Sequence, residues 1–413
     1  MLFPPNQTAA APVRVVVTGA GIVTALGLGW RANADGFRAG RAAFRPVTLF
    51  DVSRQRARLA AEVDLPAAPE SDDAASRVGR RLDRATRMLL LAAGEAWGQA
   101  GWTGGERLPL VLGTTGGGMT LGEAYVKQAL ARPALSRGQP TRIVHYQAQR
   151  QGLEVGAALG FRGPITIIAN ACASGTNALG HAWELVRTGR TERALAGGYD
   201  ALCQLTFAGF DSLQALSPTR CRPFDAGRDG LALGEGAAIL ALESLEPARR
   251  RNAEILGEII GYGAATDTHH LTQPHPGGDT ACATMTAACA SAGIGPAQVD
   301  YVNAHGTGTP ANDATEALAI NRWAGPRAPT LPVSSTKAGI GHLLGAAGAA
   351  EAVACLMAIR GQWLPPQLSL IAPDPAGRFR IVQAPADAPV RVALSNSFGF
   401  GGANASLLLR RWS

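Results

Sequence analysis

Residues 165–179 read ITIIANACASGTNAL, a run of apolar and β-branched residues that gives way to small ones. The first part predicts a buried strand from Ile165 to Asn170, and the small residues predict a helix that starts near Cys172. Unpaired N–H groups and the helix dipole would favour a thiolate at such a helix start. Cys172 is therefore a candidate nucleophile, and a buried structural cysteine is the alternative.

The same change from strand to small-residue turn occurs earlier in the chain. Residues 13–18 predict a strand that ends at Gly19-Ala20-Gly21, with a helix expected to follow, and residues 108–113 predict another strand. Short buried strands that alternate with longer helical segments are typical of α/β proteins, in which helices pack on sheets. We therefore predict an α/β fold.

A second round of this element order begins near Ala253, and no low-complexity linker precedes it. We therefore predict two similar halves, residues 1–252 and 253–413, that pack into one unit. In the second half we expect a helix over residues 279–292 and strands over residues 253–261, 299–304, 331–334, 390–395 and 403–409.

The composition allows a large core, because 46% of the 413 residues are hydrophobic and only 17% are charged. The formal net charge is +7, but the arginines are dispersed rather than gathered in one stripe or tail, which argues against a nucleic-acid binder. Modest arginine groups form either a solvated surface or a docking surface for an acidic partner protein. They are Arg54, Arg56 and Arg58; Arg77, Arg80, Arg81 and Arg84; and Arg249, Arg250 and Arg251.

The six cysteines form no Cys-x-x-Cys pair and no cluster with zinc-ligand spacing, so the sequence predicts no metal site. The opening residues, MLFPPNQTAAAPVR, lack the basic and apolar regions of a secretory signal. No stretch approaches 18 uninterrupted apolar residues. We therefore expect a cytoplasmic protein that does not enter a membrane.

Residues 302–310, VNAHGTGTP, bring His305 to the end of a predicted strand, and Asp313 and Glu316 follow. Strand ends are where α/β proteins build their sites, although a lone histidine could equally cap the turn. Residues 333–348, VSSTKAGIGHLLGAAG, place His342 at the start of an apolar helix, whose dipole would keep the imidazole neutral. Lys337 lies among small and apolar residues, and a buried lysine needs a carboxylate, for which Glu351 is the candidate.

Residues 394–404, LSNSFGFGGAN, place Phe398 and Phe400 in a glycine-rich loop between two predicted strands. Packing in a hydrophobic core does not readily explain aromatic residues in such a loop. They are better explained as a mobile wall beside a pocket, with backbone N–H groups exposed to an oxyanion. One cysteine, two histidines and a lysine at strand or helix ends form a coherent candidate set for covalent catalysis.

Together these segments resemble the β-ketoacyl-acyl-carrier-protein synthases of the I/II, elongating type, which belong to the thiolase superfamily. Further motifs carry the same resemblance: VTGAG at residues 17–21 with TALG at 24–27, and RPFD at 222–225 with RDG at 228–230 and GEG at 234–236. The resemblance covers essentially the whole chain. It implies a thiolase fold, in which two similar halves form α-β-α-β-α layers.

The resemblance also implies roles for individual residues. Cys172 would accept the acyl chain, and His305 and His342 would hydrogen-bond the malonyl thioester oxygen. Lys337, braced by Glu351, would maintain the electrostatics and hydrogen bonds of the site. The remaining expected roles are an oxyanion hole and gate (the backbone N–H groups of Cys172 and Phe400, with Phe398), pantetheine contacts (Thr307 and Thr309), a supporting acid (Glu316) and an acyl pocket (Gly116 and Phe210).

The implied activity is that of an acyltransferase, a 3-oxoacyl-ACP synthase (ketosynthase), in fatty-acid or in polyketide or polyene biosynthesis. It would join the acyl chain on Cys172 to malonyl-ACP by decarboxylative Claisen condensation. The implied partner is an acyl carrier protein (ACP), which brings phosphopantetheine with the substrate, so no cofactor of the enzyme's own is expected. A homodimer is expected. The alternative is a catalytic ketosynthase subunit that requires a Cys-less chain-length factor.

Overall fold

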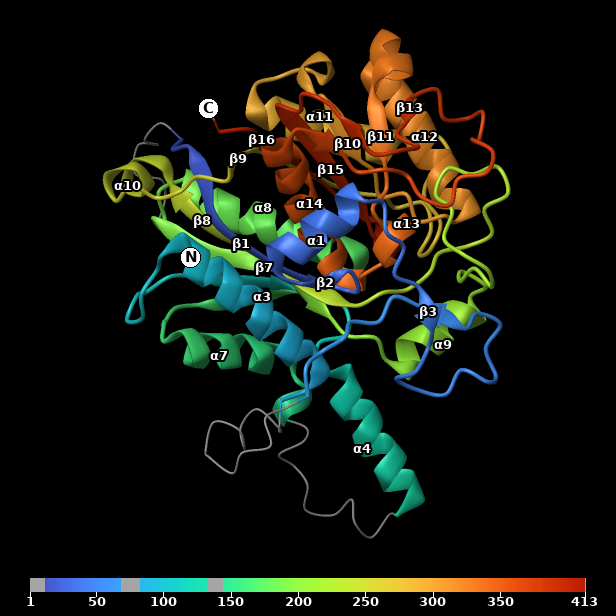
Figure 1. Ribbon diagram of the computed structural model, residues 1–413, viewed down its shortest axis with the longest axis horizontal. Coiled ribbons are helices and arrows are strands. Elements are labelled where there is room, and N and C mark those ends of the chain that lie inside the picture. Colours follow the sequence, from blue (N-terminus) through green and yellow to red (C-terminus); the bar gives the residue numbers. More distant parts are fainter. Residues whose placement is uncertain (1–11, 68–81, 133–143, 413) are drawn as a thin grey trace.

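The computed structural model describes residues 12–67, 82–132 and 144–412. Its main feature is a twelve-stranded mixed sheet, shown in Figure 1. Eleven strands follow the order β13-β11-β10-β15-β16-β9-β1-β8-β7-β5-β6, and β2 pairs with β1. Their bounds are β1 Val15–Thr24, β2 Gly27–Leu28, β5 Leu110–Gly113, β6 Ile165–Ile168, β7 Arg193–Asp200, β8 Gly236–Ser244, β9 Gly257–Thr266, β10 Tyr301–Asn303, β11 Pro332–Ser334, β13 Arg380–Ile381, β15 Val392–Phe398 and β16 Ala403–Arg410.

The strand pairing repeats itself on the two sides of the sheet. In the first set, β5 pairs in parallel with β6 and β7, while β7–β8 and β8–β1 are antiparallel. In the second set, β10 pairs in parallel with β11 and β15, while β15–β16 and β16–β9 are antiparallel. The sets join where β1 pairs with β9, with Val15 opposite Ile259. The division at residues 252 and 253 stays a prediction.

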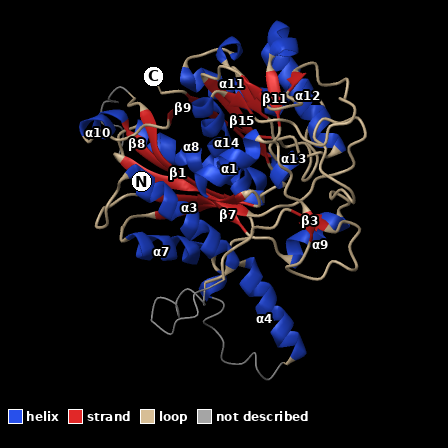
Figure 2. Cartoon of the chain, viewed as in Figure 1, coloured by secondary structure: helices blue, strands red, loops and turns tan. Residues whose placement is uncertain are grey.

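Helices form three layers around these strands, as Figures 1 and 2 show. The central layer is α8 and α14, which contact each other and strands of both sets; α3 and α7 cover the outer face of the first set, and α11 and α12 that of the second. The predicted α-β-α-β-α arrangement is thereby confirmed. The α-helices of the described residues are α1 Gly29–Arg38, α3 Arg84–Ala100, α4 Met119–Ala131, α7 Ala148–Leu159, α8 Ser174–Arg187, α9 Gln204–Ser212, α10 Leu245–Arg250, α11 Asp279–Ala292, α12 Pro310–Ala324, α13 Lys337–Ile340 and α14 Ala347–Gly361.

The central helices are rich in small residues because they pack at close range. A Cβ atom on Gly348 of α14 would lie 2.0 Å from the Thr176 hydroxyl oxygen on α8. The window Leu344–Gly361 is long and apolar enough to cross a membrane, but 89% of it is buried inside the protein. Such burial is typical of a helix in a protein core.

The first strand does not end where the sequence predicted. Strand β1 runs without a break through Gly19-Ala20-Gly21 to Thr24. The two glycines serve packing instead: a Cβ on Gly19 would lie 2.0 Å from the carbonyl oxygen of Ala96, and one on Gly21 would lie 1.9 Å from that of Ala92. Both carbonyls belong to α3, so the glycines let this helix lie directly on the strand.

Other element bounds differ from the predictions by a few residues, and the largest shifts are at β9, which runs from Gly257 to Thr266 instead of over residues 253–261. Helix α11 has the predicted bounds. Three of the arginines considered as docking groups, Arg77, Arg80 and Arg81, lie outside the described residues.

Candidate active site

Cys172 lies in a short 3₁₀ turn, Ala171–Ala173, between β6 and the first residue of α8. The residue before it, Ala171, has a φ of 55°, a left-handed conformation that a residue with a Cβ rarely adopts. Such backbone strain is typical of functional sites. Cys172 itself is 6% exposed.

The thiol differs from the sequence prediction in its protonation. Burial raises the pKa of Cys172 to about 11, while the Lys337 charge and the backbone N–H of Phe400 act in the opposite direction. The helix start was expected to favour a thiolate, but burial outweighs that effect in the substrate-free site. The neutral thiol is therefore the resting form at pH 7.

We expect alkylation of Cys172 by iodoacetamide to accelerate about tenfold per pH unit between pH 7 and 9. The thiolate is the nucleophile, and its fraction rises with pH as long as the pH stays below a pKa of about 11. Peptide mass spectrometry after timed quenching measures the rate at this residue. A rate that levels off below pH 8 would contradict the protonated resting state.

The structure brings both predicted histidines to the thiol. The Cys172 Sγ atom and one ring nitrogen each of His305 and His342 all lie within 4.8 Å of one another. The two imidazole rings are nearly perpendicular, at 85°, with centroids 5.4 Å apart. His305 follows β10, and His342 lies between α13 and α14. Two segments of the second half therefore face the nucleophile of the first.

Hydrogen bonds to the Nδ1 atoms indicate which ring nitrogens carry protons. The backbone N–H of Leu344 donates to His342 Nδ1 at 3.1 Å, and Lys337 Nζ lies 3.3 Å from His305 Nδ1. Because both Nδ1 atoms then accept, each neutral ring carries its proton on Nε2. Among the described residues, His342 Nε2 has no hydrogen-bond partner.

Both imidazoles are neutral at pH 7. Burial lowers the pKa of His305 and His342 well below the usual value, and the charge of Lys337 lowers both further. The sequence attributed neutrality at His342 to a helix dipole, whereas burial and the lysine are the causes in the structure. The site thus presents two N–H donors without adding positive charge.

Lys337 and Glu351 form a buried ion pair. Lys337 Nζ donates to Glu351 Oε1, and the two side chains are 1% and 2% exposed. Burial raises the pKa of Glu351 to about 7, and the Lys337 charge acts in the opposite direction. The pair places its ammonium group beside His305, so it connects α14 to the catalytic candidates.

Glu351→Gln is expected to lower the free energy of unfolding by about 3–5 kcal/mol, because it leaves the Lys337 charge buried without a partner. Urea denaturation at pH 7 measures the loss. The control is Glu254→Gln, which breaks a surface pair with Arg360 on the same helix α14 and should cost about 0–1 kcal/mol. Equal losses in the two variants would show that burial does not decide the effect.

Glu316 holds the turn that carries His305. Its carboxylate oxygens accept hydrogen bonds from the backbone N–H groups of His305 at 2.8 Å and Gly306 at 2.7 Å. Burial raises the pKa of Glu316 to about 7. Asn396, which the sequence analysis did not single out, donates to Glu316 at 3.1 Å and accepts from the Ser406 hydroxyl. A polar asparagine inside a buried strand was the feature that could have identified it.

The glycine-rich loop places its aromatic rings at the site. The Phe400 ring is 36% exposed and stacks on Phe210 of α9, with centroids 5.7 Å apart and an angle of 25°. The ring of Phe398 lies 5.7 Å from that of His305. The backbone N–H of Phe400 is close enough to Cys172 to lower its pKa. The loop therefore combines an apolar wall with a backbone donor beside the thiol.

A cavity of about 300 Å³ connects these groups with the surface. It is also lined by a strand-to-helix connection, residues 270–274, that the sequence analysis missed. This connection is tied to the aromatic loop, because the Gly401 N–H donates to the Leu271 carbonyl at 2.7 Å. His270 and Pro274 were the features of the sequence that could have pointed to it. The predicted residues that line the cavity are Cys172, Phe210, His305, Thr307, Thr309, His342, Phe398 and Phe400.

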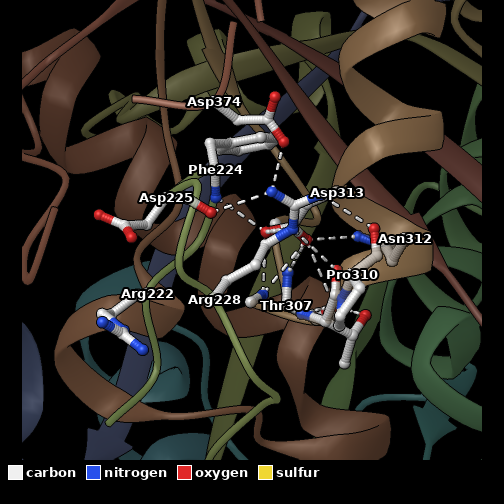
Figure 3. A network of polar contacts seen from close by, with 12 residues as sticks. Arg222, Phe224, Asp225, Arg228, Thr307, Pro310, Asn312, Asp313 and Asp374 are labelled. Carbon is white, nitrogen blue, oxygen red and sulfur yellow. Dashed lines mark hydrogen bonds and ion pairs between the residues drawn. The ribbon is translucent and has the colours of Figure 1, made fainter. Parts of the chain in front are cut away.

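A polar network fixes the loop of Thr307 and Thr309, and Figure 3 shows Thr307 among its members. Asp313 accepts hydrogen bonds from the backbone N–H of Thr307 at 3.0 Å and of Gly308. Arg228 donates to the carbonyl of Thr309 and to the Asp374 carboxylate. The Thr307 and Thr309 hydroxyl oxygens lie 2.8 Å apart. The RDG motif thus supports the loop that was predicted to contact pantetheine.

Gly116 does not line this cavity. Its N–H donates to Asp200 at 2.7 Å, and a Cβ placed on it would lie 3.3 Å from Asp200 Oδ1 and 3.7 Å from the Met119 Cβ. The structure therefore does not bring Gly116 together with Cys172, and its place in an acyl pocket stays a prediction.

Cys172, His305 and His342 are also the kind of donor set that binds zinc. The ammonium group of Lys337 is 3.3 Å from one of these histidines and would repel a second cation. Protonated Nε2 atoms and a protonated thiol are likewise not ligands. The arrangement fits N–H donation to a developing oxyanion better than metal binding.

A sheet repeated in two sets around central helices, with a cysteine at the start of one helix and two histidines opposite, defines a thiolase-fold acyltransferase. The chain belongs to the β-ketoacyl synthase family: residues 13–248 match the N-terminal domain of this family, and residues 256–370 match its C-terminal domain. It is a ketosynthase, that is, a 3-oxoacyl-ACP synthase.

Individual relatives match nearly the whole chain. It is 39% identical over 412 residues to 3-oxoacyl-[acyl-carrier-protein] synthase 2 of Synechocystis, and the match covers 97% of this chain and 98% of that protein. The solved structure of the ishigamide ketosynthase/chain length factor has a TM-score of 0.90 at 35% identity, covering 98% and 100%. A β-ketoacyl synthase structure from Burkholderia phymatum has a TM-score of 0.89 at 34% identity, covering 97% and 100%.

Proposed function

We propose that this ketosynthase extends acyl chains in two steps that Cys172, His305 and His342 carry out. In the first, the Cys172 sulfur attacks the thioester carbonyl of an acyl-ACP. A new carbon–sulfur bond forms, the bond to pantetheine breaks, and the thiol proton leaves on the pantetheine sulfur. The backbone N–H groups of Cys172 and Phe400 stabilise the oxyanion.

In the second step, malonyl-ACP enters the same cavity and loses carbon dioxide. The electrons of the broken carbon–carbon bond form an enolate, whose oxygen accepts hydrogen bonds from the two Nε2–H groups. The enolate carbon attacks the acyl group, and the Cys172 sulfur leaves to give 3-oxoacyl-ACP. The observation that carries the proposal is that two imidazoles, both with an accepting Nδ1, lie beside one buried thiol.

The supporting residues act through these groups. Lys337, with Glu351, would keep both imidazoles neutral, and Glu316 would fix the turn of His305. Thr307 and Thr309 would contact the pantetheine arm, while Phe398 and Phe400 would gate the cavity. Phe210 and Gly116 would belong to the acyl pocket, which Gly116 would open to a longer or stiffer chain.

The proposed partner is an acidic ACP, and the phosphopantetheine that it carries would make a cofactor of the enzyme's own unnecessary. Arg54, Arg56 and Arg58 are exposed, and the backbone N–H of Arg56 donates to Asp211 of α9 at 2.9 Å. This helix carries Phe210 at the cavity, so the basic segment lies beside the entrance that an acidic carrier would approach. We place the enzyme in the cytoplasm, in fatty-acid or polyketide or polyene biosynthesis.

We propose a homodimer as the working form. The alternative is a heterodimer with a chain-length factor, which the likeness to the ishigamide ketosynthase/chain length factor favours. Incubation of the purified chain alone with acyl-ACP and malonyl-ACP tests both ideas. Intact-mass detection of 3-oxoacyl-ACP from the lone chain supports the homodimer. An acyl-enzyme adduct without product points to the heterodimer, and no adduct from folded protein contradicts the proposal.

A further inference from the structure

The carboxylate of Asp200 lies at the end of β7, is fully buried and does not line the cavity. Each of its oxygens accepts two hydrogen bonds. Oδ1 receives the Thr114 hydroxyl at 2.8 Å and the Gly116 N–H at 2.7 Å, while Oδ2 receives the Thr115 N–H at 2.8 Å and the Gly345 N–H at 2.6 Å. Four donors around one buried carboxylate indicate a specific structural or functional demand.

The four donors come from two loops that are far apart in the sequence. Residues 114–116 follow β5, in the first half of the chain. Gly345 belongs to the turn Leu344–Ala346, which lies between His342 and the first residue of α14. Asp200 therefore joins a loop of the first half to the turn behind a catalytic histidine of the second.

This turn sets the tautomer of His342. The Leu344 N–H donates to His342 Nδ1, and Leu344 itself has a φ of 53°, which a residue with a Cβ rarely adopts. The next N–H along the chain, that of Gly345, is the one that Asp200 holds. A strained residue persists only where its neighbours fix it, and this hydrogen bond fixes it on one side.

The same turn also packs against the helix that follows the nucleophile. A Cβ on Gly175 of α8 would lie 2.8 Å from the Gly345 carbonyl oxygen, and one on Gly198 of β7 would lie 2.6 Å from it. The carbonyl side of Gly345 is therefore fixed by packing, and Asp200 holds its N–H side.

We propose that Asp200 is a positioning residue for condensation: it holds the Leu344–Gly345 turn so that His342 directs its Nε2–H toward the thiol. This inference rests on the proposed function, in which that N–H stabilises the enolate. Acylation of Cys172 uses the backbone oxyanion hole instead, so the two steps should depend on Asp200 to different extents. Burial raises the pKa of Asp200 to about 6, and the four hydrogen bonds oppose this shift.

Asp200→Asn is the test variant. An asparagine amide has one accepting oxygen, and its NH₂ group would face two of the four donors. Some of the hydrogen bonds that join residues 114–116 to Gly345 through residue 200 would therefore be lost. We expect condensation to fall at least tenfold while acylation of Cys172 stays within threefold. The matched control is Glu243→Gln, an equally buried acid on β8 that pairs with Arg193 and Arg251. Its ratio of condensation to acylation should stay at the wild-type value.

A second readout does not depend on activity. Nitrogen-15 NMR of histidine-labelled protein reports the tautomer of His342, which should be the Nε2–H form in the wild type and a mixture in Asp200→Asn. If this variant does not fold, Thr114→Val, which removes one donor and keeps the charge, should show a smaller change in the same direction. An unchanged tautomer, or an unchanged ratio of condensation to acylation, overturns the proposal. If the wild type does not condense acyl chains, the NMR comparison still tests whether Asp200 controls the tautomer of His342.

Discussion

Cys172→Ala should leave no acyl-enzyme adduct and should reduce condensation by at least about 10⁴-fold, as expected when a covalent nucleophile is removed. The thiol lies beside the two histidines, and Cys172 lines the cavity. Intact-protein mass spectrometry after incubation with acyl-ACP detects the adduct directly. Carriers bearing saturated, polyunsaturated and aryl-primed chains would show which acyl group the site prefers.

The control for this variant is Cys289→Ala. Cys289 is a free, buried thiol on α11 that packs in the apolar core away from the cavity. This variant should acquire the same adduct mass as the wild type. An adduct that persists in folded Cys172→Ala, or that disappears in folded Cys289→Ala, would show that Cys172 is not the nucleophile.

His305→Ala and His342→Ala should each slow condensation by a hundredfold to a thousandfold, while acylation of Cys172 largely persists. Loss of one oxyanion donor typically raises the barrier by about 3–4 kcal/mol. Decarboxylation forms the enolate without a strong base, so the histidines are needed as hydrogen-bond donors and not as proton acceptors. Acylation depends on the backbone N–H groups of Cys172 and Phe400 instead. Intact mass measures the first step, and carbon dioxide release from malonyl-ACP measures the second.

His181→Ala is the matched control for both variants, because His181 is an exposed histidine on α8, the helix that follows the nucleophile. Both of its rates should match those of the wild type. Folded His305→Ala or His342→Ala that forms no adduct would refute the division of roles between histidines and backbone donors.

The sequence allowed most of the site to be predicted because its residues lie at strand ends with recognisable local patterns. The strand before Cys172 and the Gly/Thr turn after His305 are both local features, and the α/β layers follow from the alternation of elements. By contrast, β1 continues through Gly19 and Gly21 because of a helix about 70 residues away in the sequence. Periodicity within a window cannot contain that information.

The missed features depend on contacts that are distant in sequence. Asp200 ends a strand as many aspartates do, and its importance appears only when backbone donors from two other segments meet its carboxylate. The protonation of Cys172 was mispredicted for a similar reason. A helix start is visible in the sequence, whereas the burial that raises the thiol pKa comes from residues of both halves.

The seam between β1 and β9 restricts how substrates can enter. Because hydrogen bonds and the shared helices α8 and α14 join the two halves, they cannot swing apart as the lobes of a hinge-bending enzyme do. Any change in access would then be confined to the segments that line the cavity, the Phe400 loop and residues 270–274, while the framework behind them stays rigid. Exchange of one carrier protein for the next would then proceed without any change in the spacing of sulfur and imidazoles.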